Sequence, residues 1–139
     1  MTGNQSLTIE QALQLHKKFL QDILQDVLKV LEAGEPGTAR VIEGLNKYWD
    51  ANQQHREARR KVQEVIAGTS HEQDAERMGR PFLLMLRAEL LASNAKDLDV
   101  LSQEIYDSAL EISLVEAASG ERDVARREKV IARIQAASR

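Results

Sequence analysis

The longest amphipathic pattern in the chain covers residues 8–36 and reads TIEQALQLHKKFLQDILQDVLKVLEAGEP. Apolar residues recur in it every three or four positions between Ile9 and Leu31, which is the spacing of one face of an α-helix. At 1.5 Å per residue this helix would be on the order of 40 Å long. Helices of that length are typical of helical bundles.

Both ends of this first helix carry recognisable signals. Thr8 and Gln11 have the spacing of a capping box, in which each side chain bonds the other residue's backbone N–H. Gly34 is expected to close the helix as a left-handed cap, and Pro36 to stop it. The pattern therefore predicts one complete helix with its own start and stop.

The composition narrows the possible fold classes. The chain has 139 residues, 42% of them apolar, a net charge of −3, and no cysteine. The lack of cysteine excludes disulfide scaffolds, cysteine zinc sites and thiol catalysis. Two prolines and seven glycines leave little material for a loop-rich β fold. We expect one all-α domain over residues 1–139, with a flexible start over 1–6.

The second helix is predicted over residues 38–68, and its middle is unusual. From Asp50 to Lys61 its only apolar residues are two alanines. Small residues and one valine fall on a single line at a spacing of seven: Gly44, Ala51, Ala58 and Val65. Three interpretations stay open: a solvated middle turn, a seam of small or polar residues that selects a partner or register, and a helix break.

The second half of the chain contains several joints. Ser70 and Gln73 have the spacing of a second capping box, and Pro81 suits the first turn of a new helix. Residues 82–119 are interpreted either as one helix or as two joined near Ser93–Asn94, with Asp97 as a cap. After Gly120, residues 121–139 form an amphipathic, partly basic pattern through Val124, Ile131 and Ile134.

Long helices with short connections indicate antiparallel neighbours, so the predicted architecture is an antiparallel four- or five-helix bundle. Its core is expected to hold apolar residues from the four longest patterns: Leu20, Ile23, Val27, Leu31, Ile42, Leu45, Leu84, Leu91, Leu98, Leu101, Ile105 and Ile112.

The chain shows no recognisable catalytic pattern. Of the three histidines, His16 is expected at the edge of the apolar stripe as a satisfied boundary residue, whereas His55 and His71 are expected at the surface. No pair has the His-x-x-x-His or Glu-x-x-His spacing that places two ligands on one helix face. Glycine-rich phosphate loops and nucleophile elbows are also missing. We therefore expect no catalytic residues, no metal ligands and no cofactor.

The leading functional hypothesis is a non-enzymatic helical interaction protein, such as an adaptor, chaperone, assembly or regulatory factor, that self-associates as a dimer. Wide apolar stripes on helices suit helix–helix recognition. The predicted contact surface follows the small-residue line and its aromatic neighbours: Gly44, Tyr48, Trp49, Ala51, His55 and Ala58. The competing interpretation of Tyr48 and Trp49 is ordinary core packing.

An alternative from another class is a metal-dependent helical hydrolase. Residues on one helix face, with a second acidic helix opposite, would hold a hard cation: Glu104, Asp107 and Glu111, with Glu72 and Glu76. The competing interpretation is a solvated acidic face.

Nucleic-acid binding is a weaker alternative. Two basic clusters suggest it, one at Arg56, Arg59, Arg60 and Lys61 and one in the tail, at Arg122, Arg126, Arg127, Lys129 and Arg133. The acidic balance and the lack of interleaved aromatic residues argue against it. The segment 71–120 has a net charge of −6, so it would either neutralise these clusters or leave them for an external acidic partner. No apolar run approaches membrane-spanning length, so we expect no membrane contact and a cytoplasmic location.

Overall fold

The computed structural model describes residues 7–137, and all regular structure in that range is α-helical. The helices are α1 (Ile9–Ala33), α2 (Thr38–Gln54), α3 (Arg56–Ile66), α4 (His71–Met78), α5 (Arg80–Ala92), α6 (Leu98–Ser119) and α7 (Val124–Ala137). The all-α class is confirmed, whereas the predicted count of four or five is too low.

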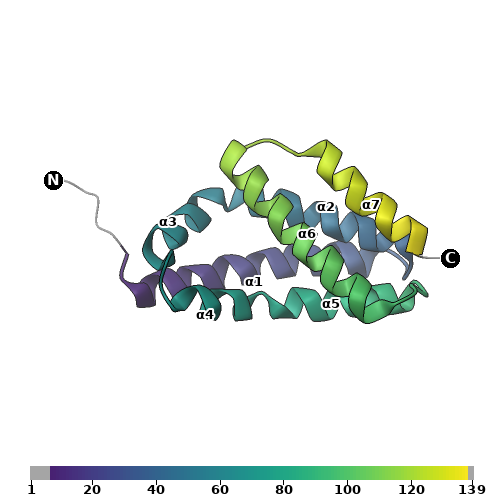
Figure 1. The fold of residues 1–139 in the computed structure, drawn as a ribbon, viewed down its shortest axis with the longest axis horizontal. Coiled ribbons are helices and arrows are strands. Elements are labelled where there is room, and N and C mark those ends of the chain that lie inside the picture. Colours follow the sequence, from purple (N-terminus) through teal and green to yellow (C-terminus); the bar gives the residue numbers. More distant parts are fainter. Residues whose placement is uncertain (1–6, 138–139) are drawn as a thin grey trace.

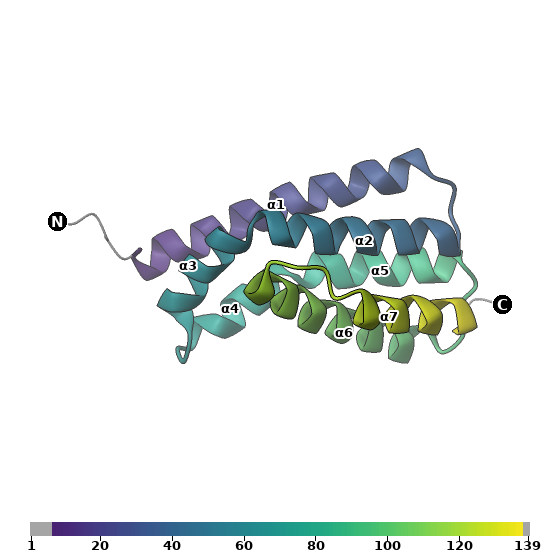
Figure 2. The ribbon, with the colours of Figure 1, turned by 90° about the horizontal axis from the view of Figure 1, so that it is seen from above.

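The helices run back and forth along one long axis (Figures 1 and 2). Helix α1 packs against α2 and α3, and α6 packs against α5, α2 and α7. Figure 1 shows α6 crossing the molecule obliquely, with α7 returning beside it. Helices α3 and α4 lie together at the end where α1 begins.

Helix α1 begins as the sequence predicts and ends differently. The Thr8 hydroxyl accepts from the Gln11 N–H at 3.1 Å, and the Gln11 side chain accepts from the Thr8 N–H at 3.0 Å, so the capping box is confirmed. Gly34 is extended, with φ −109°, rather than left-handed. Its carbonyl instead accepts from Arg40 Nη1, and Arg40 also binds Glu89 with two hydrogen bonds. The Arg40 side chain of α2 therefore holds the segment that connects α1 to α2.

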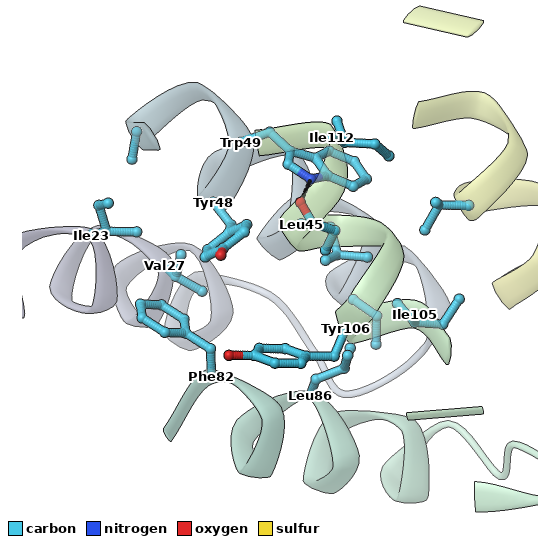
Figure 3. Packing of buried hydrophobic residues seen from close by; sticks show 14 of the residues in the cluster. Ile23, Val27, Leu45, Tyr48, Trp49, Phe82, Leu86, Ile105, Tyr106 and Ile112 are labelled. Atoms are coloured by element: carbon cyan, nitrogen blue, oxygen red, sulfur yellow. Dashed lines mark hydrogen bonds between the residues drawn. The ribbon is translucent and has the colours of Figure 1, made fainter. Parts of the chain in front are cut away.

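One buried apolar cluster draws side chains from all seven helices. Trp49 is fully buried at its centre, and its indole N–H donates to the Ala109 carbonyl at 3.1 Å (Figure 3). The Tyr48 ring meets the Phe82 ring edge-on, with centroids 5.1 Å apart. A cluster shared by all seven helices is what a single domain requires. The single domain expected over residues 1–139 itself stays a prediction. The flexibility expected for residues 1–6 lies outside the described residues.

Most of the predicted core is buried or partly buried, but Leu84 and Leu91 are exposed to 66% and 59%. Helix α5 is apolar on nearly every side, so its sequence does not tell which side faces inward. The structure buries Phe82, Leu86 and Leu90 instead. The expectation for Leu84 and Leu91 was wrong for that reason.

The second helical pattern breaks at His55, which separates α2 from α3. The side-chain amide of Asn52 donates to the Tyr48 carbonyl at 2.8 Å, and Asn52 is buried. Side chains that bond nearby backbone groups compete with the helix and bend it. The structure therefore shows the helix break, with Ala51 and Asn52 buried before it and Gln54, Arg56 and Glu57 exposed around it.

The joint between α3 and α4 is built by a residue other than the predicted one. Ser70 makes no side-chain capping bond. The Thr69 hydroxyl instead donates to the Ile66 carbonyl and accepts from the His71 N–H, at 2.6 and 3.2 Å. A carboxylate oxygen of Glu72 accepts from the Gly68 N–H at 3.2 Å. The capping box expected at Ser70 and Gln73 is therefore absent.

The remaining joints follow the sequence more closely. Pro81 lies in the first turn of α5. Residues 82–119 form two helices rather than one, because Asn94 and Asp97 take left-handed conformations with φ of 59° and 51°. Asp97 precedes α6 but makes no side-chain capping bond. Gly120 ends α6 in the left-handed conformation, with φ 76°.

Helix α7 covers most of the predicted tail helix, and the structure buries part of its expected apolar side. Ile134 is buried and Ile131 is partly buried, as the pattern predicts, whereas Val124 is 57% exposed. Val130 and Arg127 are buried beside Ile134. Among the described residues, no helix is long and apolar enough to cross a membrane.

Candidate functional site

The predicted contact surface lies largely inside the protein. Gly44, Tyr48, Trp49 and Ala51 are buried, and a Cβ added at Gly44 would meet Leu31 Cδ2 at 3.0 Å. The small-residue line therefore serves the close approach of α1 and α2 within the chain, and these four residues do not form an external surface. The interpretation of both aromatic rings as core is confirmed.

The other two predicted contact residues lie at the helix break. His55 is partly buried rather than solvated, and its ring stacks on Phe19 with centroids 6.1 Å apart. Ala58 is partly buried on α3. Neither residue lines the large cavity that the described residues form beside the helix break.

This cavity, which we call the Arg59 cleft, has a volume of about 590 Å³. It lies between α3 and α4 on one side and α1 and α6 on the other. Its apolar walls come from four helices and include Phe19, Leu20, Val62, Ile66, Phe82, Leu110 and Leu114. A volume between about 300 and 1,000 Å³ with mostly apolar walls is characteristic of small-molecule sites.

Arg59 reaches into this cleft from α3, and its partners are neutral. Its Nη1 donates to Asn52 Oδ1 at 2.8 Å and to Ser113 Oγ at 3.0 Å. The Ser113 hydroxyl itself donates to the Leu110 carbonyl, so the three residues form a network across α2, α3 and α6. Among the described residues no carboxylate forms an ion pair with Arg59. A partly buried guanidinium thus faces the cleft without a compensating charge.

The electrostatics around Arg59 agree with this geometry. Burial lowers the pKa of Arg59, although an arginine stays protonated throughout the physiological range. Burial also lowers the pKa of His16, which lines the same cleft, and the Arg59 charge lowers it further. His16 Nε2 lies 3.1 Å from the Ala75 carbonyl, so the neutral ring donates there. The satisfied boundary histidine is confirmed, and it adds no charge to the cleft at neutral pH.

The rim of the cleft carries charges of both signs. Arg60 pairs with Glu57 at 2.7 Å, one turn earlier in α3, and both side chains are exposed. Glu72 and Glu76 of α4 lie on the opposite side. Arg56 also lines the cleft and passes against Gly120. Because these groups are exposed to water, their fields are screened more than that of Arg59.

The acidic residues of the hydrolase alternative are dispersed. Glu104 pairs with Arg133 at 3.2 Å, Glu111 lies 3.9 Å from Arg126, and Asp107 accepts from Gln103. Within residues 7–137 no group of three or more histidines and carboxylates is placed to hold a metal ion. His71 pairs only with Asp74, at 3.1 Å. The hydrolase hypothesis therefore gains no support from this arrangement.

The tail arginines are paired within the protein. Arg127 makes two 2.6 Å bonds to the buried Glu116 and one 3.0 Å bond to Asp50, and it lies over the Trp49 ring at 5.1 Å. Arg122 also binds Asp50, at 2.8 Å. Together with the pairs to Glu104 and Glu111, these contacts show that acidic residues of α6 meet the basic tail. The nucleic-acid hypothesis loses one of its two clusters.

A second surface feature lies on α5. Pro81, Leu84, Ala88 and Leu91 are all exposed, and their spacing of three and four places them on one side of the helix. We call these residues the α5 stripe. The sequence analysis placed Leu84 and Leu91 in the core. It recognised the apolar pattern of α5 but not which side of the helix faces the solvent.

Comparisons of the chain with protein-family models, with curated proteins and with solved structures found no match.

Proposed function

We propose that this protein is a non-enzymatic helical interaction module that associates with a second copy of itself through the α5 stripe. The observation that supports the proposal is the exposure of Leu84 and Leu91, to 66% and 59%, on one side of one helix. Single exposed apolar residues are common on protein surfaces, whereas a continuous stripe of them indicates a contact surface.

The form of the stripe favours a symmetric dimer. Two-fold interfaces use the same patch on both partners. If two copies of α5 lie antiparallel, Leu84 of each copy faces Leu91 of the other, and the alanine between them allows close approach. We expect the dimer to bury more than roughly 1,200 Å², including surface beside the stripe. A cytoplasmic location and an adaptor, chaperone or assembly role remain part of the proposal.

The test is sedimentation over a range of concentrations for the wild type and for Leu84→Glu. The wild type is expected to show a concentration-dependent dimer, and the variant a monomer of unchanged helix content, because a buried unpaired carboxylate opposes association. Val124→Glu is the matched control, since Val124 is a similarly exposed apolar residue on α7. A wild type that stays monomeric at every concentration, or a control that dissociates as fully as Leu84→Glu, would contradict the proposal.

A further inference from the structure

The Arg59 cleft combines a cation without a counter-ion and apolar walls of small-molecule size. A buried charge is tolerated when it is paired and hydrogen-bonded, and removing its partner is costly. Arg59 has only two neutral oxygen partners, Asn52 and Ser113, and both bind the same nitrogen, Nη1. Its Nε and Nη2 have no protein acceptor among the described residues, so one edge of the guanidinium is free to bind a ligand.

The free edge of an arginine fits one ligand chemistry particularly well. Guanidinium and carboxylate form two parallel charge-assisted hydrogen bonds. The neighbours of Arg59, which are Asn52, Ser113, Tyr48 and the His16 ring, are neutral, so they do not compete for that edge with a negative charge. A carboxylate placed there would supply the compensating charge that the fold itself does not.

The rim of the cleft does not add a net positive charge to that of Arg59. The carboxylates of Glu57, Glu72 and Glu76 line it together with Arg56 and Arg60, so the rim offers no basic surface for a polyanion such as a nucleic acid. The wall on α6 is apolar, through Leu110 and Leu114, and Leu114 remains 54% exposed. An exposed leucine at the edge of a cleft is a surface that an apolar ligand would cover.

We propose that the Arg59 cleft binds a small organic anion with one carboxylate and an apolar body, such as a medium-chain fatty acid, with the carboxylate on Arg59. No residue of the α5 stripe lines the cleft, and the inference does not depend on self-association. Ligand binding and dimer formation are measured separately, so the failure of one leaves the other standing.

The experiment is calorimetric titration of the full chain with three probes: decanoate below its micelle concentration, decanol and acetate. Decanoate carries both the charge and the apolar body, whereas each of the other probes carries one of them. We expect saturable binding of one decanoate per chain, roughly ten- to a hundredfold weaker binding of decanol, and no measurable binding of acetate. Decanoate is also expected to raise the melting temperature.

Two variants test the two halves of the site. Arg59→Met should weaken decanoate to the affinity of decanol and leave decanol unchanged, because it removes the charge and keeps an apolar side chain. Leu114→Asn should weaken both ligands, and as a change at an exposed position it leaves the fold intact. Val124→Asn, the same kind of change outside the cleft, should bind like the wild type. If Arg59→Met does not fold, the proposal is still tested by the wild-type affinities for the three probes and by the affinities of Leu114→Asn.

Several results would overturn the proposal. They are the lack of saturable decanoate binding, equal affinities of the wild type for decanoate and decanol, and an Arg59→Met variant that folds and still prefers decanoate. Tighter binding of a poly-glutamate peptide than of decanoate would also overturn it, because that ligand uses charge without the apolar walls.

Discussion

At the scale of single residues, Gly79 shows how closely two helices approach at the α4–α5 junction. Its backbone is helical, with φ −84° and ψ −9°, so no left-handed conformation requires glycine there. The requirement comes from space, because a Cβ at this position would lie 2.8 Å from the Tyr106 hydroxyl. Tyr106 is buried on α6, so its ring has little freedom to move away.

We expect Gly79→Ala to lower the free energy of unfolding by about 1–3 kcal/mol, because overpacking outweighs the better helix propensity of alanine. Urea unfolding followed by circular dichroism measures this change. In a Tyr106→Phe background, which removes the hydroxyl, the same substitution should cost markedly less. Equal losses in both backgrounds would show that the hydroxyl is not the cause.

The two tyrosines of the chain are both buried, and burial raises the pKa of each. Burial raises the pKa of Tyr106 from 10.0 to about 12, with smaller increases from the charges of Tyr48, Glu76 and Asp107. Burial also raises the pKa of Tyr48. The folded protein therefore holds the tyrosine protons more tightly than the unfolded chain does.

Because the folded pKa is the higher one, this contribution to stability is complete below pH 10 and is lost as the pH rises toward about 12. We expect no tyrosinate absorbance near pH 10 in the folded protein, and a rise near pH 12 together with unfolding. The urea-unfolded chain should titrate near pH 10. A folded protein in which both tyrosines ionise near pH 10 would show that neither ring is sealed from water.

At the scale of elements, the buried pair of Arg127 and Glu116 attaches α7 to α6. Every charged atom in it has a partner, since Glu116 Oε2 also accepts from the Asp123 N–H at 2.8 Å. Removing one member leaves a buried charge without compensation, whereas replacing both with apolar side chains does not.

Arg127→Met should therefore destabilise the protein by about 3–5 kcal/mol, and the double change Arg127→Met with Glu116→Leu should recover most of that loss. Thermal and urea unfolding measure both. Arg122→Met is the control, because Arg122 binds the same Asp50 from an exposed position, and its loss should cost less than about 1 kcal/mol. A double variant as unstable as the single one would contradict the argument.

The small-residue line makes a related prediction for α2. Ala51 is fully buried, so Ala51→Leu should cost about 1–3 kcal/mol through overpacking. Ala58 is partly exposed on α3, and Ala58→Leu should cost clearly less. Equal effects in urea unfolding would show that the line does not pack inward at Ala51. The comparison separates a core seam from a surface position on the same heptad line.

At the scale of the whole molecule, the charges fall into two groups. The basic tail is neutralised by acidic residues of α6 and by Asp50 of α2, whereas the α3 cluster keeps Arg59 without a carboxylate. At the cleft, helices α3 and α6 are joined by the hydrogen bond from Arg59 to Ser113. The uncompensated charge therefore lies in the Arg59 cleft, and that coincidence supports the proposed ligand site.

Much of the helical structure was readable from local patterns. The capping box at Thr8, the position of Pro81 and the stop at Gly120 depend only on neighbouring residues, so the sequence predicts them without knowledge of the fold. The candidate site was less predictable. Arg59 was noticed as one of a basic cluster, but its neutral partners Asn52 and Ser113 lie 7 and 54 residues away along the chain.

Periodicity and caps act over three or four residues, so local patterns alone predict a helical protein and the ends of most of its helices. The packing of the helices sets which side of α5 faces the solvent, which cations are paired, and where a cleft remains. Those properties depend on helices far apart in the chain meeting at particular angles, and an apolar helix or a basic cluster is compatible with several such arrangements. The direction of Leu84 and the isolation of Arg59 both follow from that packing.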